Sequence, residues 1–355
     1  MSRYSSKGLP FVFPGVVNVN SCKTSAEVMQ AARLDWKVKK TEIMAKMPLS
    51  LDMDKSLDDL LKMKERDSDA HIHGKNIYSL VPNAYTTYRD DNKIPLGIVK
   101  QKYTIVQNVS AFEFFDTVVG ENKAIWQTAG YFGNGEKVFV SAKLPDNILV
   151  KGDKVDNYLV FVNSHDGSSG VKILFTPIRV ICQNTLTAAI RTSTNYISIR
   201  HTESAHANIK QAHEVLGITK KKIEYANEVY NMLANIKVTD EIVMEYICKH
   251  NLSEAEIEKL LGTNHTFKQV IYRNGSAVED AEISTRKLNI ITDTWEYYND
   301  GIGQKEIAGT AWGAFNAISG YYSNVDNSEG SKRMDSLLFN DKAKKLEKAI
   351  NYEFV

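Results

Sequence analysis

The sequence predicts an α+β protein in which an antiparallel, β-rich central domain with packed helices is followed by a helical C-terminal part. Two observations indicate this class. Apolar runs of strand length joined by turn-forming residues dominate residues 76–202, and the spacing of apolar residues becomes helical from Glu203 onward. Because strands and helices occur in separate runs, this class is favoured over alternating βαβ units. We expect an N-terminal arm, helix and charged segment (1–75), a β-rich core domain (76–202) and a helical C-terminal region (203–355).

The N-terminal region predicts one capped helix and one strand. Thr24 or Ser25 provides a hydroxyl N-cap for a helix over residues 26–34. Residues 34–40 then alternate apolar and charged side chains, which is typical of a strand. Residues 52–75 carry many charges and indicate a solvated helix or an insertion.

The first half of the central domain predicts a strand and two β pairs. Residues 76–89 read as a strand, and residues 96–99 and 103–106 as a short pair across a Lys-Gln-Lys turn. Residues 125–131 and 137–144 are joined by Gly-Asn-Gly, and Asn-Gly is the strongest short hairpin signal in the chain.

The second half of the domain centres on two apolar runs separated by a polar loop. Residues 158–162 and 171–175 are aromatic and β-branched, and residues 163–170 (NSHDGSSG) between them are turn formers. We predict that the two runs pair as antiparallel strands. Asn184 or Thr185 is then a plausible N-cap for a following helix. The other helices are expected over residues 111–119, 205–233 (one or two helices), 240–250, 253–261, 287–298 and 310–322, with a lysine-rich tail over 332–352.

The composition is that of an ordinary globular chain, with 43% hydrophobic residues, 25% charged residues and a net charge of +1. So small a net charge neither favours nor excludes nucleic acid, because only a local basic surface matters. Three scattered cysteines without a CxxC pair are typical of a reducing cytosol. No apolar run has the length of a membrane span and the N-terminus lacks the features of a secretory signal. We expect a cytoplasmic protein without membrane contact.

Two histidine patterns invite a metal-site interpretation. His71 and His73 face the same side of a strand, but no carboxylate or thiol cluster accompanies them. His206 and His213 would share a helix face with Lys210, whose charge opposes a cation. A solvated polar face explains this second pattern better. We therefore expect no metal and no cofactor.

The polar loop also invites a catalytic interpretation, because Ser164, His165 and Asp166 are adjacent. Neighbouring residues in one loop rarely build a triad, and nothing in the sequence supplies an oxyanion hole. The chain contains no Walker, GxGxxG, HExxH or GxSxG motif. We expect an exposed loop that could touch phosphate through hydroxyls and amides, and we expect no enzyme activity.

The segment from Lys172 to Arg200 contains no acidic residue, which is uncommon in a chain whose charges otherwise balance. A basic surface rich in hydroxyls and amides suits a polyanion, and nucleic acid is the first candidate. The alternative, which we weigh equally, is that the arginines cap strand ends or pair with acids elsewhere in the chain. Tyr131, Phe132 or Tyr196 would stack on bases. The predicted nucleic-acid-binding residues are Lys172, Arg179, Gln183, Asn184, Thr185, Arg191 and Arg200.

Several segments together resemble the phage/plasmid-like proteins catalogued as a domain of unknown function. The segments are LDWKVKK, LGIVKQKYTIVQN, TAGYFGNGEKVFVSAKL, NSHDGSSG, TPIRVICQNTL and TAWGAFNAISGYY, and the similarity spans roughly residues 24–325. The arm before Thr24, the charged stretch over 52–75 and the lysine-rich tail look particular to this chain. The resemblance implies a phage, plasmid or related mobile element in a bacterial host cell, and it implies no catalytic residue. The order of elements is also similar to that of single-strand annealing proteins of the Rad52 and RecT kind, which assemble into rings or filaments on DNA.

The leading hypothesis is a non-enzymatic nucleic-acid-binding protein of a phage or mobile element, active in single-stranded DNA binding or annealing during recombination. Its expected partners are single-stranded nucleic acid and further copies of the chain in a homo-oligomer. The alternative is a phage interaction or assembly factor that acts on a host or virion protein. A metal-dependent nuclease is the weakest of the three hypotheses, because no paired carboxylates with histidine appear near the polar centre.

Overall fold

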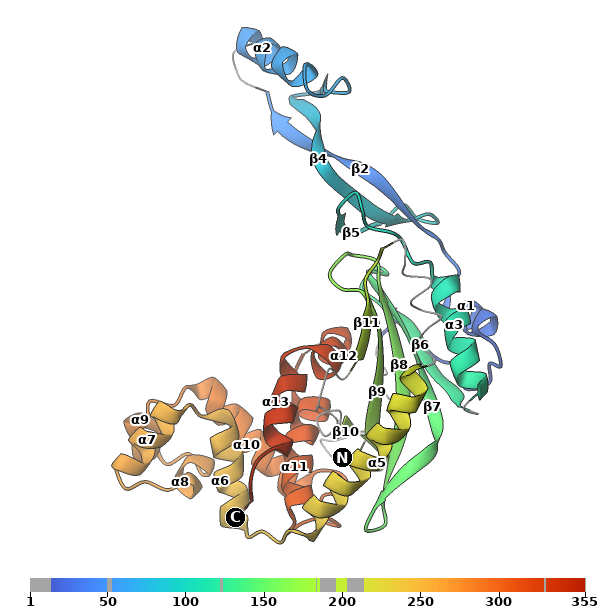
Figure 1. Ribbon diagram of the computed structural model, residues 1–355. Helices are drawn as coiled ribbons and strands as arrows, with labels where there is room; N and C mark the ends of the chain where they lie inside the picture. The colour runs from blue at the N-terminus through green and yellow to red at the C-terminus, as the bar shows by residue number, and fades with distance from the viewer. Residues whose placement is uncertain are drawn as a thin grey trace.

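The computed structural model describes residues 14–49, 53–121, 124–182, 184–185, 196–202, 214–328 and 330–354. An arm of long strands projects from one end of a central antiparallel sheet, and the C-terminal helices lie beside this sheet (Figure 1). The helix α2 (Met53–Lys64) sits at the far tip of the arm (Figure 1). This arrangement confirms the α+β class with an antiparallel sheet in the centre and helices at the C-terminus.

The central sheet has seven strands in the order β1-β6-β7-β8-β9-β10, with β11 pairing to β9. Both predicted hairpins are present. Tyr131 pairs with Val138 across the Asn-Gly turn, and Val160 pairs with Leu174 across the polar loop. The strands are β1 (Val16–Asn18), β6 (Ile125–Phe132), β7 (Lys137–Val150), β8 (Asp153–Ser164), β9 (Val171–Arg179), β10 (Asn184–Thr185) and β11 (Tyr196–Ile199).

A second, four-stranded antiparallel sheet forms the arm, and we call it the arm sheet. Its strands are β2 (Val38–Pro48), β3 (His71–His73), β4 (Asn76–Arg89) and β5 (Pro95–Val99). β4 is the central strand and pairs with the other three. The expected pairing of residues 96–99 with 103–106 is wrong: β5 pairs with β4, and residues 103–106 form no strand. The predicted strand over 34–40 begins at Val38.

The cap predicted for the first helix is confirmed, and Thr239, for which no cap was predicted, caps a second helix. The Thr24 hydroxyl accepts a hydrogen bond from the Glu27 amide at the start of α1 (Ser25–Ala32), and the Thr239 hydroxyl accepts one from Ile242 at the start of α6. Of the charged segment 52–75, residues 53–64 form the helix α2. The remaining helices are α3 (Asn108–Glu121), α5 (Glu214–Asn235), α6 (Asp240–Asn251), α7 (Glu254–Gly262), α8 (Phe267–Ile271), α9 (Gly275–Asp280), α10 (Thr285–Asp300), α11 (Ala311–Gly320) with its π-helical continuation η3 (Tyr321–Val325), α12 (Gly330–Phe339) and α13 (Asp341–Ile350).

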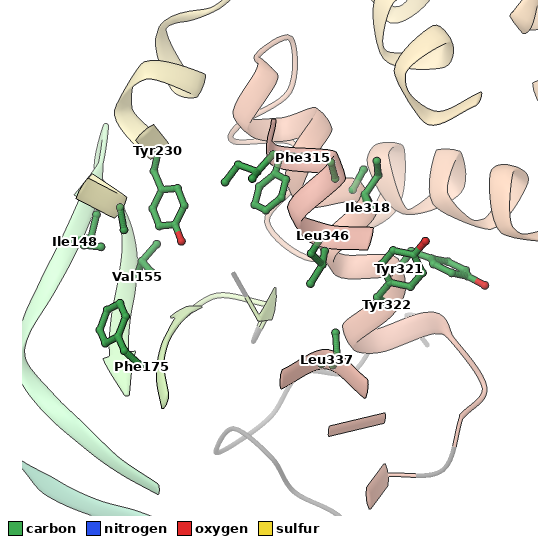
Figure 2. Packing of buried hydrophobic residues seen from close by; sticks show 14 of the residues in the cluster. Ile148, Val155, Phe175, Tyr230, Phe315, Ile318, Tyr321, Tyr322, Leu337 and Leu346 are labelled. Atoms are coloured by element: carbon green, nitrogen blue, oxygen red, sulfur yellow. The ribbon is translucent and has the colours of Figure 1, made fainter. Parts of the chain in front are cut away.

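One hydrophobic core joins the sheet to the C-terminal helices. Ile148, Val155 and Phe175 of the central sheet belong to the same buried cluster as Tyr230 of α5 and Phe315 of α11 (Figure 2). The boundary expected at residue 202 therefore separates strands from helices but does not separate two cores. The expected N-cap at Asn184 or Thr185 is wrong, because both residues lie in β10 and pair with β9. The helix expected after them falls on residues outside those described.

Candidate nucleic-acid interface

Arg179, one of the three arginines of the predicted site, is buried in a polar network. Its side chain is 0% exposed, and its Nε lies 2.5 Å from Asp153 Oδ2. Its Nη2 donates to the Gly303 carbonyl at 2.8 Å, and Trp312 Nε1 donates to the same Asp153 oxygen at 2.9 Å. A guanidinium enclosed in this way does not present a donor to a phosphate. The sequence left two roles open for Arg179, binding a phosphate or pairing with an acid elsewhere in the chain. The structure shows the pairing, with Asp153.

Asn184 and Thr185 are buried as well, and they tie β10 to the α11–η3 helix. Asn184 Nδ2 donates to the Asn316 carbonyl at 3.2 Å, and Asn184 Oδ1 accepts from Asn324 Nδ2 at 2.8 Å. The Thr185 amide donates to Ser323 Oγ at 3.1 Å. Buried amides and hydroxyls must be hydrogen-bonded to avoid a desolvation cost, and these contacts satisfy that requirement. The two residues therefore hold the fold together and form no exposed surface.

Of the other four predicted contacts, only Lys172 and Arg200 lie among the described residues. Lys172 is half-buried, its Nζ lies 4.4 Å from the centre of the Phe339 ring, and burial lowers the pKa of the ammonium. Arg200 is exposed. Gln183 and Arg191 lie outside the described residues. The acid-free segment thus does not form one exposed basic face in the part of the chain that can be described.

Two of the three aromatic residues expected to stack on bases, Tyr131 and Phe132, already pack against other side chains of the protein. Phe132 is 7% exposed and stacks on Phe139 with 5.4 Å between ring centres. Tyr131 is half-buried beside the Arg89 guanidinium, 5.7 Å from its ring centre. The side chain of Tyr196 lies outside the described residues. Phe132 is a core residue, so its assignment as a stacking platform is wrong.

The polar loop after β8 is not the fully exposed loop that was expected. His165 is 0% exposed: its Nε2 lies 2.8 Å from Asn108 Oδ1, and its carbonyl accepts from the Thr87 hydroxyl at 2.6 Å. Burial lowers the pKa of His165 to about 3, so the ring is neutral at pH 7. Because Thr87 belongs to β4, this loop attaches the arm sheet to the body. Only the segment from Gly167 to Ser168 is exposed.

No group of three or more metal-ligating side chains occurs among the described residues. His71 and His73 do lie side by side on the arm, where they contact the Tyr78 ring at 5.5 and 6.3 Å between ring centres. His206 and His213 lie outside the described residues. None of the helices that are described is long and apolar enough to cross a membrane.

The arm sheet carries a basic surface that the sequence-based site did not include. Strand alternation and the observed register place Lys39 and Thr41 of β2, Thr86 and Tyr88 of β4, and Ile98 of β5 on one face. We call this the outer face of the arm sheet. It lies opposite the face of Thr87, which points into the body. Lys39 and Thr41 are exposed, and Ile98 is 70% exposed.

A half-buried tyrosine lies at the centre of this outer face. Tyr88 pairs with Lys39 on one side and with Pro95 on the other, and Lys93 Nζ lies 5.9 Å from its ring centre. Lys93 Nζ also donates to the Asp90 carbonyl at 2.7 Å, which fixes its position. Lys39 makes no ion pair in the described structure. The outer face therefore combines an aromatic ring with ammonium groups that are open to solvent.

The charge of the arm sheet is far from that of the whole chain. The four strands of the sheet contain four basic residues and one acidic residue, which gives +3. Together with the turns that flank the strands, residues 37–49 and 71–103 contain nine basic and three acidic residues, which gives 9 − 3 = +6. The whole chain carries +1. The signal is present in the sequence, but it is divided between two segments that only the pairing of β2 with β4 brings together.

A family model described as a domain of unknown function, DUF932, matches residues 95–350. No curated protein and no solved structure matches the chain. The match begins at the first residue of β5, so β2, β3 and β4 of the arm precede it. It includes most of the lysine-rich tail, which we had expected to be particular to this chain. Because the match covers more than half of the sequence, the chain belongs to the DUF932 family.

Proposed function

We propose that this protein binds single-stranded nucleic acid through the outer face of the arm sheet. The observation that carries the proposal is the +6 charge of the arm sheet and its flanking turns (residues 37–49 and 71–103) in a chain of net charge +1. Lysine ammonium groups attract phosphates and release condensed counterions when they bind, which supplies sequence-independent affinity. Arg179, Asn184 and Thr185, which the sequence predicted for this role, support the fold instead.

The form of the surface favours a single strand over a duplex. Proteins that bind single strands combine a basic track with aromatic rings on which unpaired bases stack. Tyr88 supplies such a ring between Lys39 and Lys93, and the exposed Thr41 hydroxyl on the same face can hydrogen-bond to the nucleic-acid backbone. Bases in a duplex are already stacked and do not present their faces to a tyrosine. We therefore assign Tyr88 the stacking role.

The distal part of the arm extends the same chemistry. Tyr78 pairs with Lys46 of β2 and with His71 of β3, so these three side chains share one face of the sheet. His71 stacks on Tyr78 at an interplanar angle of 12°. A register shift between Glu42 and Met44 separates this distal cluster from Tyr88, so the arm carries two aromatic clusters at different points along its length.

Strand annealing by a homo-oligomer in a phage or other mobile element is the finer function that we propose, on the basis of the resemblance described above. A protein-interaction role is a second candidate, and one observation favours it. Leu57 and Leu61 lie one turn apart on α2 and are 55% and 58% exposed. The two functions are distinguishable, because an interaction factor requires no affinity for nucleic acid.

A stacking experiment tests the proposal. Fluorescence anisotropy with a labelled oligo(dT) strand at low salt should show binding by the wild-type protein, with weaker binding to a duplex of the same length. Tyr88→Leu should lose about 1–3 kcal/mol of affinity, which is the contribution of one stacked base. Tyr88→Phe keeps the aromatic face and should bind like the wild type. Equal losses for Leu and Phe, or no binding by the wild type, would contradict the proposal.

A further inference from the structure

A cleft of about 720 Å³ lies on the body, far along the chain from the arm sheet. It is formed where the β7–β8 turn, the turn after β9, the end of α5 and the segment before α11 meet. Its volume is within the range of about 300–1,000 Å³ that is typical of small-molecule sites. Two of the segments that carry the family resemblance contribute to the lining. Val180 and Ile181 come from TPIRVICQNTL, and Thr310 and Trp312 come from TAWGAFNAISGYY.

Three lysines surround this cleft: Lys151, Lys154 and Lys237. Two acidic residues also line it, but Asp153 is paired with the buried Arg179, which leaves Glu306 as the acid without a buried cationic partner. The lining residues alone have a net charge of 3 − 2 = +1, and the total is +2 when Arg179, the partner of Asp153, is counted with them. Lys154 is 3.7 Å from Asp156, whose other oxygen is already held by Lys143 at 2.5 Å.

Lys151 has a backbone conformation that lysine seldom adopts. Lys151 (φ +49°) and Gly152 (φ +92°) are the two central residues of the hairpin turn between the paired residues Val150 and Asp153. Turns of this type prefer Asn, Asp or Gly at the first of these positions, since both residues need positive φ. A residue held in this region against its preference is commonly found at a functional site. Lys151 keeps this conformation while its exposed side chain lines the cleft.

The other walls of the cleft are held rigidly. Lys237 forms a β-bridge with Thr310, and the Ala311 amide donates to the Ile236 carbonyl at 3.0 Å. Trp312 Nε1 and Arg179 both donate to Asp153, which fixes the floor. Ile181 packs against Gly303, where an added Cβ would lie 2.7 Å from the isoleucine side chain. A preformed site binds with a smaller ordering cost.

We propose that this cleft binds a small organic phosphate of nucleotide size, with the phosphate on Lys151 and Lys237 and the organic part against the apolar wall. The wall is made by Val150, Val180, Ile181, Ala234, Ile307 and Ala308. Val180 and Ile181 are 37% and 38% exposed, so a bound ligand would shield them from water. A free nucleotide and the phosphorylated end of a strand offer the same chemistry.

Calorimetric titration of the full chain with ADP at low salt tests this site. ADP should bind, while adenosine, which lacks the phosphate, should bind at least about tenfold more weakly. Lys151→Asn combined with Lys237→Gln should weaken ADP binding by a similar factor, and Lys151→Asn suits the turn better than lysine does. Ala308→Trp fills the cleft from an exposed position and should abolish binding. Lys305→Gln, exposed and outside the lining, is the matched control.

Absence of ADP binding by the wild type would overturn the proposal, as would binding that is unchanged in the lysine double variant. Equal affinity for adenosine and ADP would also overturn it. Competition between ADP and a 5′-phosphorylated oligo(dT), but not the unphosphorylated strand, would identify a strand end as the source of the phosphate; its absence would identify a free nucleotide. Lys39→Gln on the arm sheet should leave ADP affinity unchanged. The proposal for this cleft and the proposal for the arm sheet are therefore tested independently.

Discussion

Replacing Arg179 should destabilise the fold and leave nucleic-acid binding by the remaining folded protein intact. Arg179→Met keeps much of the side-chain volume but removes the ion pair with Asp153 and the hydrogen bond to the Gly303 carbonyl. Asp153 then keeps Trp312 Nε1 but loses its cation. Breaking a buried ion pair by removing one partner costs about 3–5 kcal/mol, which is a factor of about 10² to 10³·⁵ in the unfolding equilibrium.

Urea denaturation monitored by tryptophan fluorescence measures this loss, because Trp312 belongs to the network. Arg200→Met is the matched control, since Arg200 is exposed, and should change the free energy of unfolding by no more than about 0.5 kcal/mol. Replacing Asp153 by Asn together with Arg179→Met should cost less than the sum of the two single changes, because the unpaired charge is removed. If the Arg179→Met variant is as stable as the wild type and its DNA binding depends less on salt, the structural role is refuted. The result would then support a contact between Arg179 and a phosphate.

Three further predictions concern stability. Burial lowers the pKa of His165 to about 3 against an ordinary value near 6.5, so the unfolded chain binds the proton first as pH falls. The free energy of unfolding should therefore drop by ~2 kcal/mol from this residue between pH 7 and pH 5. A pH series in which His165→Gln shows the same slope as the wild type would exclude His165 as the cause of this drop. Gly97→Ala would place a Cβ 2.4 Å from the Asp166 carbonyl oxygen, so the arm should detach partly and the melting temperature should fall, with ~1–3 kcal/mol lost; an unchanged melting temperature would contradict this packing. Thr239→Ala removes the α6 cap and should cost ~1 kcal/mol, measured by chemical denaturation with Thr239→Ser as the control that keeps the hydroxyl; equal losses would show that the cap is not the cause.

Elements defined by local chemistry could be predicted from the sequence. The β6–β7 hairpin closes through a loop over residues 133–136, between the paired residues Phe132 and Lys137, and Gly133 and Gly135 adopt positive φ there. The helices α6 and α7 begin after Thr239 and Ser253, whose hydroxyls cap them, so their expected bounds differ from the observed ones by about one residue. Such signals act within a few residues and do not depend on the rest of the fold.

Pairings between distant segments could not be predicted in the same way. β5 pairs with β4 because the long arm strand brings Tyr85 opposite Val99, whereas residues 103–106 are held by other contacts, among them the Thr104 amide on the His201 carbonyl. His165 is buried only because the arm closes over it through Thr87. The turn-forming residues around His165 predict a loop, but they do not indicate that another part of the chain buries it.

The candidate site depended most on such distant contacts. The acid-free segment that contains Arg179 looked basic because its partner, Asp153, lies 26 residues earlier and precedes the segment. The basic arm sheet was not recognised because β2 and β4 are separated in the sequence by the acidic segment around α2. A net charge calculated along the chain averages the basic strands with this acidic segment, which the fold places at the tip of the arm.

The salt dependence of single-strand binding tests the central claim most directly. If Lys39 and Lys93 contact phosphates, replacing both with Gln should reduce the slope of log affinity against log salt by about 0.7 for each contact, or about 1.4 in total. The loss should be similar for different DNA sequences, because backbone contacts carry no base information. Lys259→Gln with Lys305→Gln removes the same charge from the helical part of the chain and should leave the slope unchanged. A slope that is equal in all three proteins, or no binding by the wild type at low salt, would contradict the assignment of the arm sheet as the nucleic-acid interface.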